Sequence, residues 1–187
     1  RKLGNSSKEN TAYPEIISSL NRTDLINLGK TFIEETKFIR TDQPIFIDKM
    51  PNNFSHIGLI KLILPKAKII DARRNPMDTC FSCYKQLFAR GQAFTYDQTE
   101  IARYYLNYIR LMDHWDEILP GHIFRVQHEQ LLEDQEKVTR DLLNFCELDF
   151  EHATLEFYKN SRAVKTASSE QVREPIKNKG LHQWKKY

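Results

Sequence analysis

Cysteine is scarce in this chain of 187 residues, which holds only Cys80, Cys83 and Cys146. Three cysteines are too few for a disulfide framework. Cys80 and Cys83 have the CxxC spacing of zinc and redox sites. A zinc site needs a second pair of ligands, and a redox site needs a thioredoxin-like βαβ unit, and the sequence supplies neither. We interpret both thiols as small apolar residues on one helix face and predict no metal site.

Long apolar runs and an excess of one charge are also lacking. The longest apolar run, residues 57–64, contains Lys61 and ends before Pro65, well short of the ~20 residues that span a membrane. The net charge of +3 admits a small anionic ligand but gives no basic stripe of the kind that nucleic-acid-binding proteins carry. We therefore expect neither a membrane span nor a nucleic-acid partner.

The arrangement of apolar segments predicts an α/β fold. With 40% hydrophobic and 28% charged residues, the chain can bury one sizeable core, so we expect a single domain over residues 1–187. Short apolar runs that are typical of buried strands alternate with helical patterns, which implies a parallel sheet with crossover helices. The expected strands are residues 45–47, 67–72 and 122–126, and the expected helices begin near Pro14, Asp24 (an N-cap), Asn53 (an N-cap), Met77, Ile101, Lys137 and Ala153.

The helix over residues 101–119 has the clearest pattern in the chain. Its three-four spacing places Tyr104, Tyr108, Leu111 and Trp115 on one stripe. We interpret this stripe as core rather than as a binding site, in spite of its tyrosines.

One strand end carries the residues of an anion site. Ligands of parallel sheets bind at the carboxyl ends of the strands, where this chain places Arg73 and Arg74. The helix that follows offers N–H groups and a positive dipole end, with Asp78 or Thr79 as expected caps. Arg74 and Ser82, eight residues later, could close on one phosphate. The local pattern is equally compatible with arginines that solvate a loop.

Four segments resemble PAPS-dependent sulfotransferases, whose donor is 3′-phosphoadenosine 5′-phosphosulfate. Residues 67–82 resemble the 3′-phosphate motif, and residues 46–54 the lysine-bearing strand end of the tyrosylprotein sulfotransferases and their bacterial relatives, which often follow tetratricopeptide repeats. Residues 126–131 resemble the YEQL-type strand-to-helix element, and residues 166–176 with 180–187 the carboxyl-terminal segment. The four segments occur in the family's order.

The resemblance implies a P-loop-like parallel sheet flanked by helices, and transfer of a sulfuryl group from PAPS to an acceptor hydroxyl or amine, with PAP as product. The acceptor would be a protein tyrosine, a sugar or a small molecule. An upstream tetratricopeptide domain and a cytoplasmic location, or the Golgi lumen in a eukaryote, are also expected.

The resemblance also assigns roles to residues. Lys49 matches the lysine that stabilises charge on the leaving phosphate, and Ser168 the serine that bonds the donor, with Thr166 and Ser169 as alternatives. Residues 161–187 would form a donor-binding tail. The residues expected at the 3′-phosphate are Arg74 and Ser82, with Arg73, Arg173, Lys177 and Lys179 adding to the clamp and Trp184 stacking on the adenine or packing on the core.

Two features of the family do not occur in the sequence. One is the PRSGTT-like strand-loop-helix that cradles the phosphosulfate, and the other is the Gly-Glu segment that supplies the catalytic base. Both would lie before Arg1, so we expect a partial domain. This leaves a second hypothesis, a nucleotide-binding or scaffold module without catalysis. A kinase-like transferase is disfavoured, because GxxxxGK[ST] and a magnesium-binding Asp are lacking.

Overall fold

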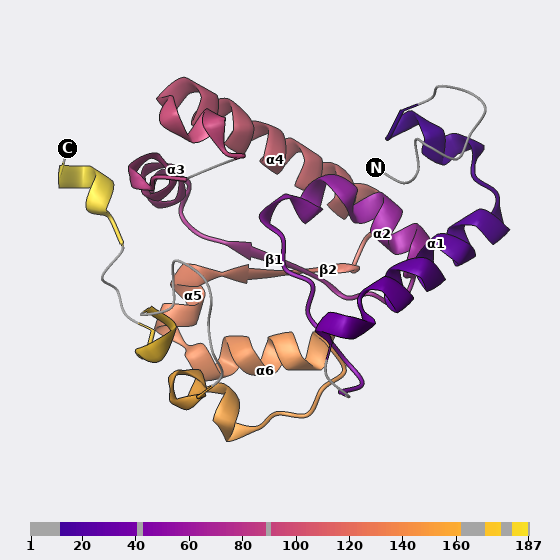
Figure 1. Ribbon diagram of the computed structural model, residues 1–187. Helices are drawn as coiled ribbons and strands as arrows, with labels where there is room; N and C mark the ends of the chain where they lie inside the picture. Colours follow the sequence, from indigo (N-terminus) through magenta and orange to yellow (C-terminus); the bar gives the residue numbers. More distant parts are fainter. Residues whose placement is uncertain (1–11, 41–42, 89–90, 162–170, 177–180, 187) are drawn as a thin grey trace. The chain divides into compact units, whose positions relative to one another are not determined.

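The structure, a computed structural model, describes residues 12–40, 43–88, 91–161, 171–176 and 181–186 (Figure 1). It is rich in helix and contains a small parallel sheet of two strands, which is an α/β arrangement. The chain divides into two compact units, Arg1–Ala67 and Lys68–Tyr187. No helix in the described ranges is long and apolar enough to cross a membrane.

The first unit is built on two packed helices, α1 and α2. The core side chains Ile16 and Ile57 are buried at 2% and 3% exposure. The helices approach closely at Gly29, where a Cβ atom would lie 2.1 Å from the carbonyl oxygen of Ile63. The elements of this unit are the 3₁₀ turns Glu15–Ser19, Lys37–Ile39 and Pro51–His56 and the helices α1 (Arg22–Glu35) and α2 (Ile57–Ile63).

The predicted strand over residues 45–47 is wrong. This segment has no regular structure, and Ile45 and Ile47 are 53% and 86% exposed. A strand exists only where a neighbour completes its hydrogen-bond ladder, and the described part of the chain pairs no strand with it. Three apolar residues in sequence are too short a pattern to reveal this.

Two predicted helix caps are also wrong. Asn21, not Asp24, caps α1: its side chain accepts bonds from the N–H groups of Thr23 and Asp24, while the Asp24 carboxylate accepts the N–H of Asn21. This is a capping box, in which the acidic residue occupies the third position of the helix. Asn53 lies inside a 3₁₀ turn, and α2 starts after it.

The second unit holds both strands of the sheet. Strand β1 (Ile69–Arg73) pairs in parallel with β2 (Ile123–Gln127), from Ile69 opposite Ile123 to Arg73 opposite Gln127. Both strands were predicted, with ends shifted by one or two residues. Helices α3 (Pro76–Lys85) and α4 (Gln98–Ile118) connect them, and α5 (His128–Glu133) and α6 (Gln135–Phe145) follow β2.

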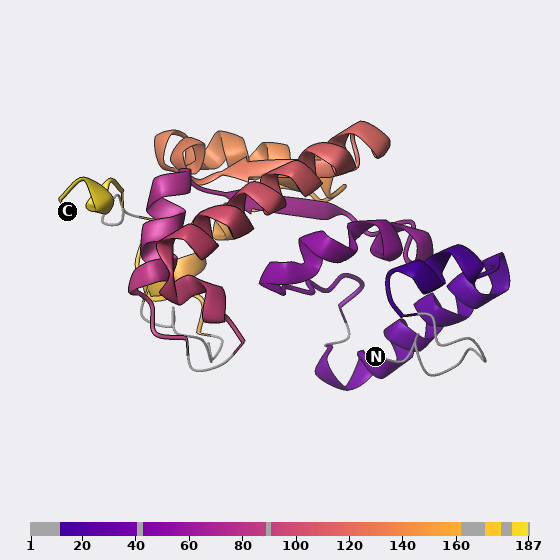
Figure 2. The same cartoon turned by 90° about the horizontal axis from the view of Figure 1, so that it is seen from above.

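The two faces of this sheet meet different helices (Figure 1). Asp71 on β1 and Arg125 on β2 are opposite each other and bond side chains of α4. Phe124, the next residue along β2, contacts the ring of Phe145 on α6, with 5.3 Å between centroids. This is the alternation of side chains expected of a strand. Seen from above, α4 crosses the strands obliquely (Figure 2).

The predicted stripe of helix α4 is half-buried along its length, at Tyr104, Tyr108, Leu111 and Trp115. Ile101 and Met112 are buried at 6% and 1% exposure, and Trp115 is half-buried.

Two other predicted helices are shorter than expected. The segment after Pro14 is a 3₁₀ turn, and the segment near residues 153–159 forms two 3₁₀ turns, His152–Thr154 and Phe157–Lys159. Segments this short gain too few hydrogen bonds to offset helix nucleation.

Candidate functional site

The site lies where β1 and β2 end together. Arg73 and Gln127 are the last residues of the two strands and are paired in register. Arg74 and Asn75 lead from β1 directly into α3, while β2 leads directly into α5. The strand-turn-helix predicted for residues 67–82 is therefore present, at the edge of the sheet where parallel folds place their ligands.

The amino-terminal end of α3 differs from our expectation. The cap is Asn75, not Asp78 or Thr79: its Oδ1 accepts the N–H groups of Met77 at 3.0 Å and Asp78 at 3.3 Å. Pro76 has no N–H group to give, and the N–H of Asn75 donates to Glu129 Oε1 at 2.9 Å. These backbone donors, which we expected to attract an anion, are bonded to side chains of the protein. The dipole remains, but recognition of an anion here falls to side chains.

Arg73 turns back towards the sheet. Its Nε donates to Asp71 Oδ2 at 2.6 Å, and its guanidinium lies over the Tyr108 ring, 5.2 Å from the centroid. Its Nη2 is buried and has no hydrogen-bond partner among the described residues. Arg73 is thus held by the protein at the carboxyl end of β1, and its Nη2 is a buried donor without an acceptor among the described residues.

Asp71 gathers three donors around one buried carboxylate. Tyr108 donates to Oδ1 at 2.5 Å, and Arg125 Nε lies 3.3 Å from Oδ2, which also receives Arg73. Arg125 also bonds Asp116 at 2.6 Å. Burial raises the pKa of Tyr108, and the bond and charge of Asp71 raise it further, so the phenol keeps its proton and donates.

The sequence patterns did not lead us to predict this cluster, although one signal was visible. Asp71 stands between the apolar residues Ile70 and Ala72 of the strand, and a carboxylate in such a place requires partners. Its partner Tyr108 was predicted to pack in the core. The prediction describes the ring but leaves out the hydroxyl, which donates to Asp71.

Arg74 and Ser82 occupy the turn and the helix that follows it. Arg74 is half-buried, and Ser82 is exposed on α3. The rise of 1.5 Å per residue places Ser82 about 9 Å along the helix axis from Pro76. It shares a helix face with Asp78 and Thr79, because they precede it by four and three residues. That Arg74 and Ser82 close on one phosphate stays a prediction.

Glu129 links the second strand to this turn. Besides the N–H of Asn75, its carboxylate accepts Gln127 Nε2 at 2.6 Å. Burial acts to raise the pKa of Glu129, but the bonds from Asn75, its own N–H and Gln127, with the charge of His128, outweigh it and lower the pKa below its ordinary value. Glu129 is therefore ionised at neutral pH. We did not predict a role for it, although it stands in the YEQL-like segment.

Lys49 belongs to the first unit. It lies exposed in the irregular segment before Pro51, and not at the end of a buried strand as expected. Its catalytic role stays a prediction.

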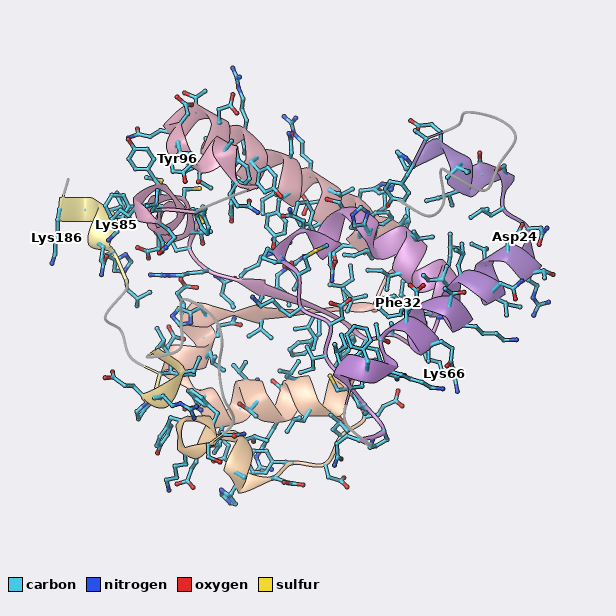
Figure 3. All side chains as sticks on the ribbon, in the orientation of Figure 1. Asp24, Phe32, Lys66, Lys85, Tyr96 and Lys186 are labelled. Carbon is cyan, nitrogen blue, oxygen red and sulfur yellow. The ribbon has the colours of Figure 1, made fainter. Side chains whose placement is uncertain are left out.

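The carboxyl-terminal tail is described in part. Ser168, Lys177 and Lys179 lie outside the described residues, as do Thr166 and Ser169. Arg173 donates to the carbonyl of Asn160. The 3₁₀ turn Gln183–Lys186 contacts α3, where Gln183 accepts a bond of 2.7 Å from Lys85; Figure 3 shows Lys85 beside this turn.

Trp184 and the two helix cysteines have environments that fit packing roles. Trp184 is half-buried in the last turn of the described chain, with Lys185 5.7 Å from its ring centroid. Cys80 and Cys83 are half-buried free thiols on α3, and burial raises the pKa of both. Within the described ranges no group of three or more His, Cys, Asp or Glu residues could hold a metal ion.

Two comparisons with known proteins bear on the family of this chain. An uncharacterized protein of Aquifex aeolicus (strain VF5) is 36% identical over 183 residues, which are 96% of this chain and 24% of that protein. The chain thus spans about a quarter of the length of this relative. The model of the sulfotransferase family matches residues 5–152, well over half of the chain. The protein described here therefore belongs to the sulfotransferase family.

Proposed function

We propose that this chain binds PAPS by its 3′-phosphate and takes part in transfer of the sulfuryl group to an acceptor hydroxyl or amine. The observation that carries the proposal is the pair of arginines at the carboxyl end of β1. Arg73 is fixed against Asp71, while Arg74 begins the turn into α3. An arginine at such an edge is suited to a phosphate, because its planar guanidinium makes paired, charge-assisted bonds.

The residues at this edge fit a 3′-phosphate. Such a group carries nearly two negative charges at neutral pH and accepts hydrogen bonds only. Arg74 supplies a cation and Ser82 a hydroxyl. The buried Nη2 of Arg73 carries N–H groups that donate to no described residue.

Two acidic side chains of this edge, Asp71 and Glu129, are already engaged by donors of the protein. A third, Asp78, lies on the helix face of Ser82 and is buried, and its carboxylate has no hydrogen-bond partner among the described residues. An anion that binds Arg74 and Ser82 therefore leaves the bonds of Asp71 and Glu129 in place.

The remaining assignments follow from family membership and from the sequence resemblance. When bound, PAPS supplies the sulfuryl group on a phosphate leaving group. Lys49 is proposed to stabilise the charge that develops on that phosphate, since a compact ammonium suits this task. Ser168 is proposed to bond the donor, and Arg173, Lys177 and Lys179 to add positive charge, with Trp184 near the adenine.

The proposal is tested by comparing two nucleotides that differ only in the 3′-phosphate. We expect the full chain to bind adenosine 3′,5′-bisphosphate more tightly than AMP in calorimetry. Arg74→Ala should weaken the bisphosphate about ten- to a hundredfold, the loss expected of a charge-assisted contact, and leave AMP unchanged. Ser82→Ala should act in the same direction, but less.

Arg110→Ala is the matched control, since Arg110 is exposed on α4, has no proposed role and should not alter the binding of either nucleotide. Equal affinity of the unaltered chain for the two nucleotides would contradict the proposal. So would an equal loss in Arg74→Ala and Arg110→Ala, which would indicate a general effect of charge.

A further inference from the structure

The peptide group between Arg74 and Asn75 is held at both of its polar atoms. Its N–H donates to Glu129 Oε1 at 2.9 Å. Its carbonyl oxygen lies 3.5 Å from the Thr79 hydroxyl, the outer limit of a hydrogen bond. A peptide group is planar, so holding its orientation restricts the two torsions that flank it, ψ of Arg74 and φ of Asn75. The direction in which the Arg74 side chain leaves the backbone therefore depends on the bond to Glu129.

Glu129 is itself braced by the strand that pairs with β1. It stands in the first turn of α5, two residues after Gln127, which pairs with Arg73. Gln127 donates to its second oxygen at 2.6 Å, so both oxygens of the carboxylate are engaged. The bond to Asn75 thus connects the turn after β1 to the end of β2. A charged acceptor makes this bond stronger than a neutral one would.

The negative charge of Glu129 lies beside the proposed phosphate site. A negative charge beside a phosphate site repels the phosphate, so if charge alone mattered, removing Glu129 would improve binding of the anion. If Glu129 acts by holding the turn, its removal weakens binding instead, because Arg74 loses its fixed direction. The two effects have opposite signs, which makes the role of Glu129 measurable.

We propose that Glu129 is a positioning residue that locks the Arg74–Asn75 turn and thereby sets the preference for nucleotides with a 3′-phosphate. The inference rests on the proposed function, since it assumes that Arg74 binds the phosphate. Glu129 itself does not touch the nucleotide. It acts through the backbone, by accepting the N–H of Asn75.

The binding test uses the full chain with adenosine 3′,5′-bisphosphate and AMP. Glu129→Ala should lower the affinity for the bisphosphate about tenfold and leave that for AMP unchanged, so the preference falls. Glu129→Gln keeps an acceptor for the Asn75 N–H and removes the negative charge, so it should retain the preference. Glu133→Ala, a change to an exposed acid at the other end of α5, should have no effect.

Hydrogen exchange of the Asn75 amide provides a second readout that needs no nucleotide. In Glu129→Ala the exchange of this amide should accelerate about tenfold or more, while the amides of β1 keep their protection. An unchanged exchange rate of the Asn75 amide in Glu129→Ala would show that Glu129 does not hold the turn. If the exchange becomes faster but the preference for the bisphosphate over AMP stays the same or grows, Glu129 is not a positioning residue. If the unaltered chain shows no preference at all, the proposed function fails first, and the inferred selectivity fails with it.

Discussion

The Tyr108 hydroxyl donates to Asp71 Oδ1 at 2.5 Å and so joins the middle of α4 to the centre of β1. Asp71 is only 8% exposed, and its other oxygen receives Arg73 from its own strand and Arg125 from β2. One carboxylate therefore connects both strands to the helix that covers them. Its burial is tolerable because donors from three elements satisfy it.

Removal of the Tyr108 hydroxyl should destabilise the second unit. In Tyr108→Phe the buried Asp71 carboxylate loses a donor while the ring keeps its packing. A hydrogen bond to a charged group contributes about 1.5–3 kcal/mol, and we expect a loss of that order in the free energy of unfolding, measured in urea. Tyr84→Phe is the control, because Tyr84 is 42% exposed on α3 and should change stability little. Equal losses in both variants would contradict the role of Asp71.

The example of Asp71 shows what the sequence could predict of the site. The strand, the turn and α3 follow from local pattern, because each depends on residues close in sequence. The partner of Asp71 could not be found in this way, since Tyr108 lies 37 positions away and only the placement of α4 brings it near. The same holds for Glu129, which is 54 positions from Asn75.

The cap of α3 was predicted wrongly for a different reason. Asparagine before proline is a local signal for the start of a helix, and Asn75-Pro76 carries it. It was overlooked in favour of Asp78, which is inside the first turn and buried at 2% exposure. The strand expected at residues 45–47 failed for a physical reason instead, because a ladder partner cannot be seen in the strand's own residues.

Gly29 tests the packing of the first unit. In Gly29→Ala the new methyl group would lie 2.1 Å from the Ile63 carbonyl oxygen, a backbone atom that cannot rotate away. The two helices must separate, which should cost about 1–3 kcal/mol in the free energy of unfolding. Thr31→Ala is the control: it places alanine at an exposed position of the same helix and should be neutral or slightly stabilising. An unchanged stability of Gly29→Ala would show that α1 and α2 do not approach this closely.

Lys49 tests whether the protein catalyses transfer or only binds the nucleotide. Stabilisation of charge on a leaving group acts in the transition state, so Lys49→Ala should lower turnover far more than it lowers affinity for adenosine 3′,5′-bisphosphate. We expect a fall in turnover of about a hundredfold or more, measured by transfer from PAPS to tyrosine peptides, sugars and simple alcohols in the full-length gene product that carries this chain.

Lys66→Ala is the control for Lys49→Ala, because Lys66 is an exposed lysine of the same unit, in the turn after α2, and has no proposed role (Figure 3). Its loss changes the net charge by the same amount, so it should leave turnover as it was. Equal effects of the two substitutions would show that charge, not position, matters, and would remove Lys49 from the mechanism. An unaltered protein that binds the bisphosphate with the expected preference, yet transfers sulfuryl to none of these acceptors, would favour a nucleotide-binding module. In that case Arg74 and Glu129 keep their roles in recognition, because neither role depends on turnover.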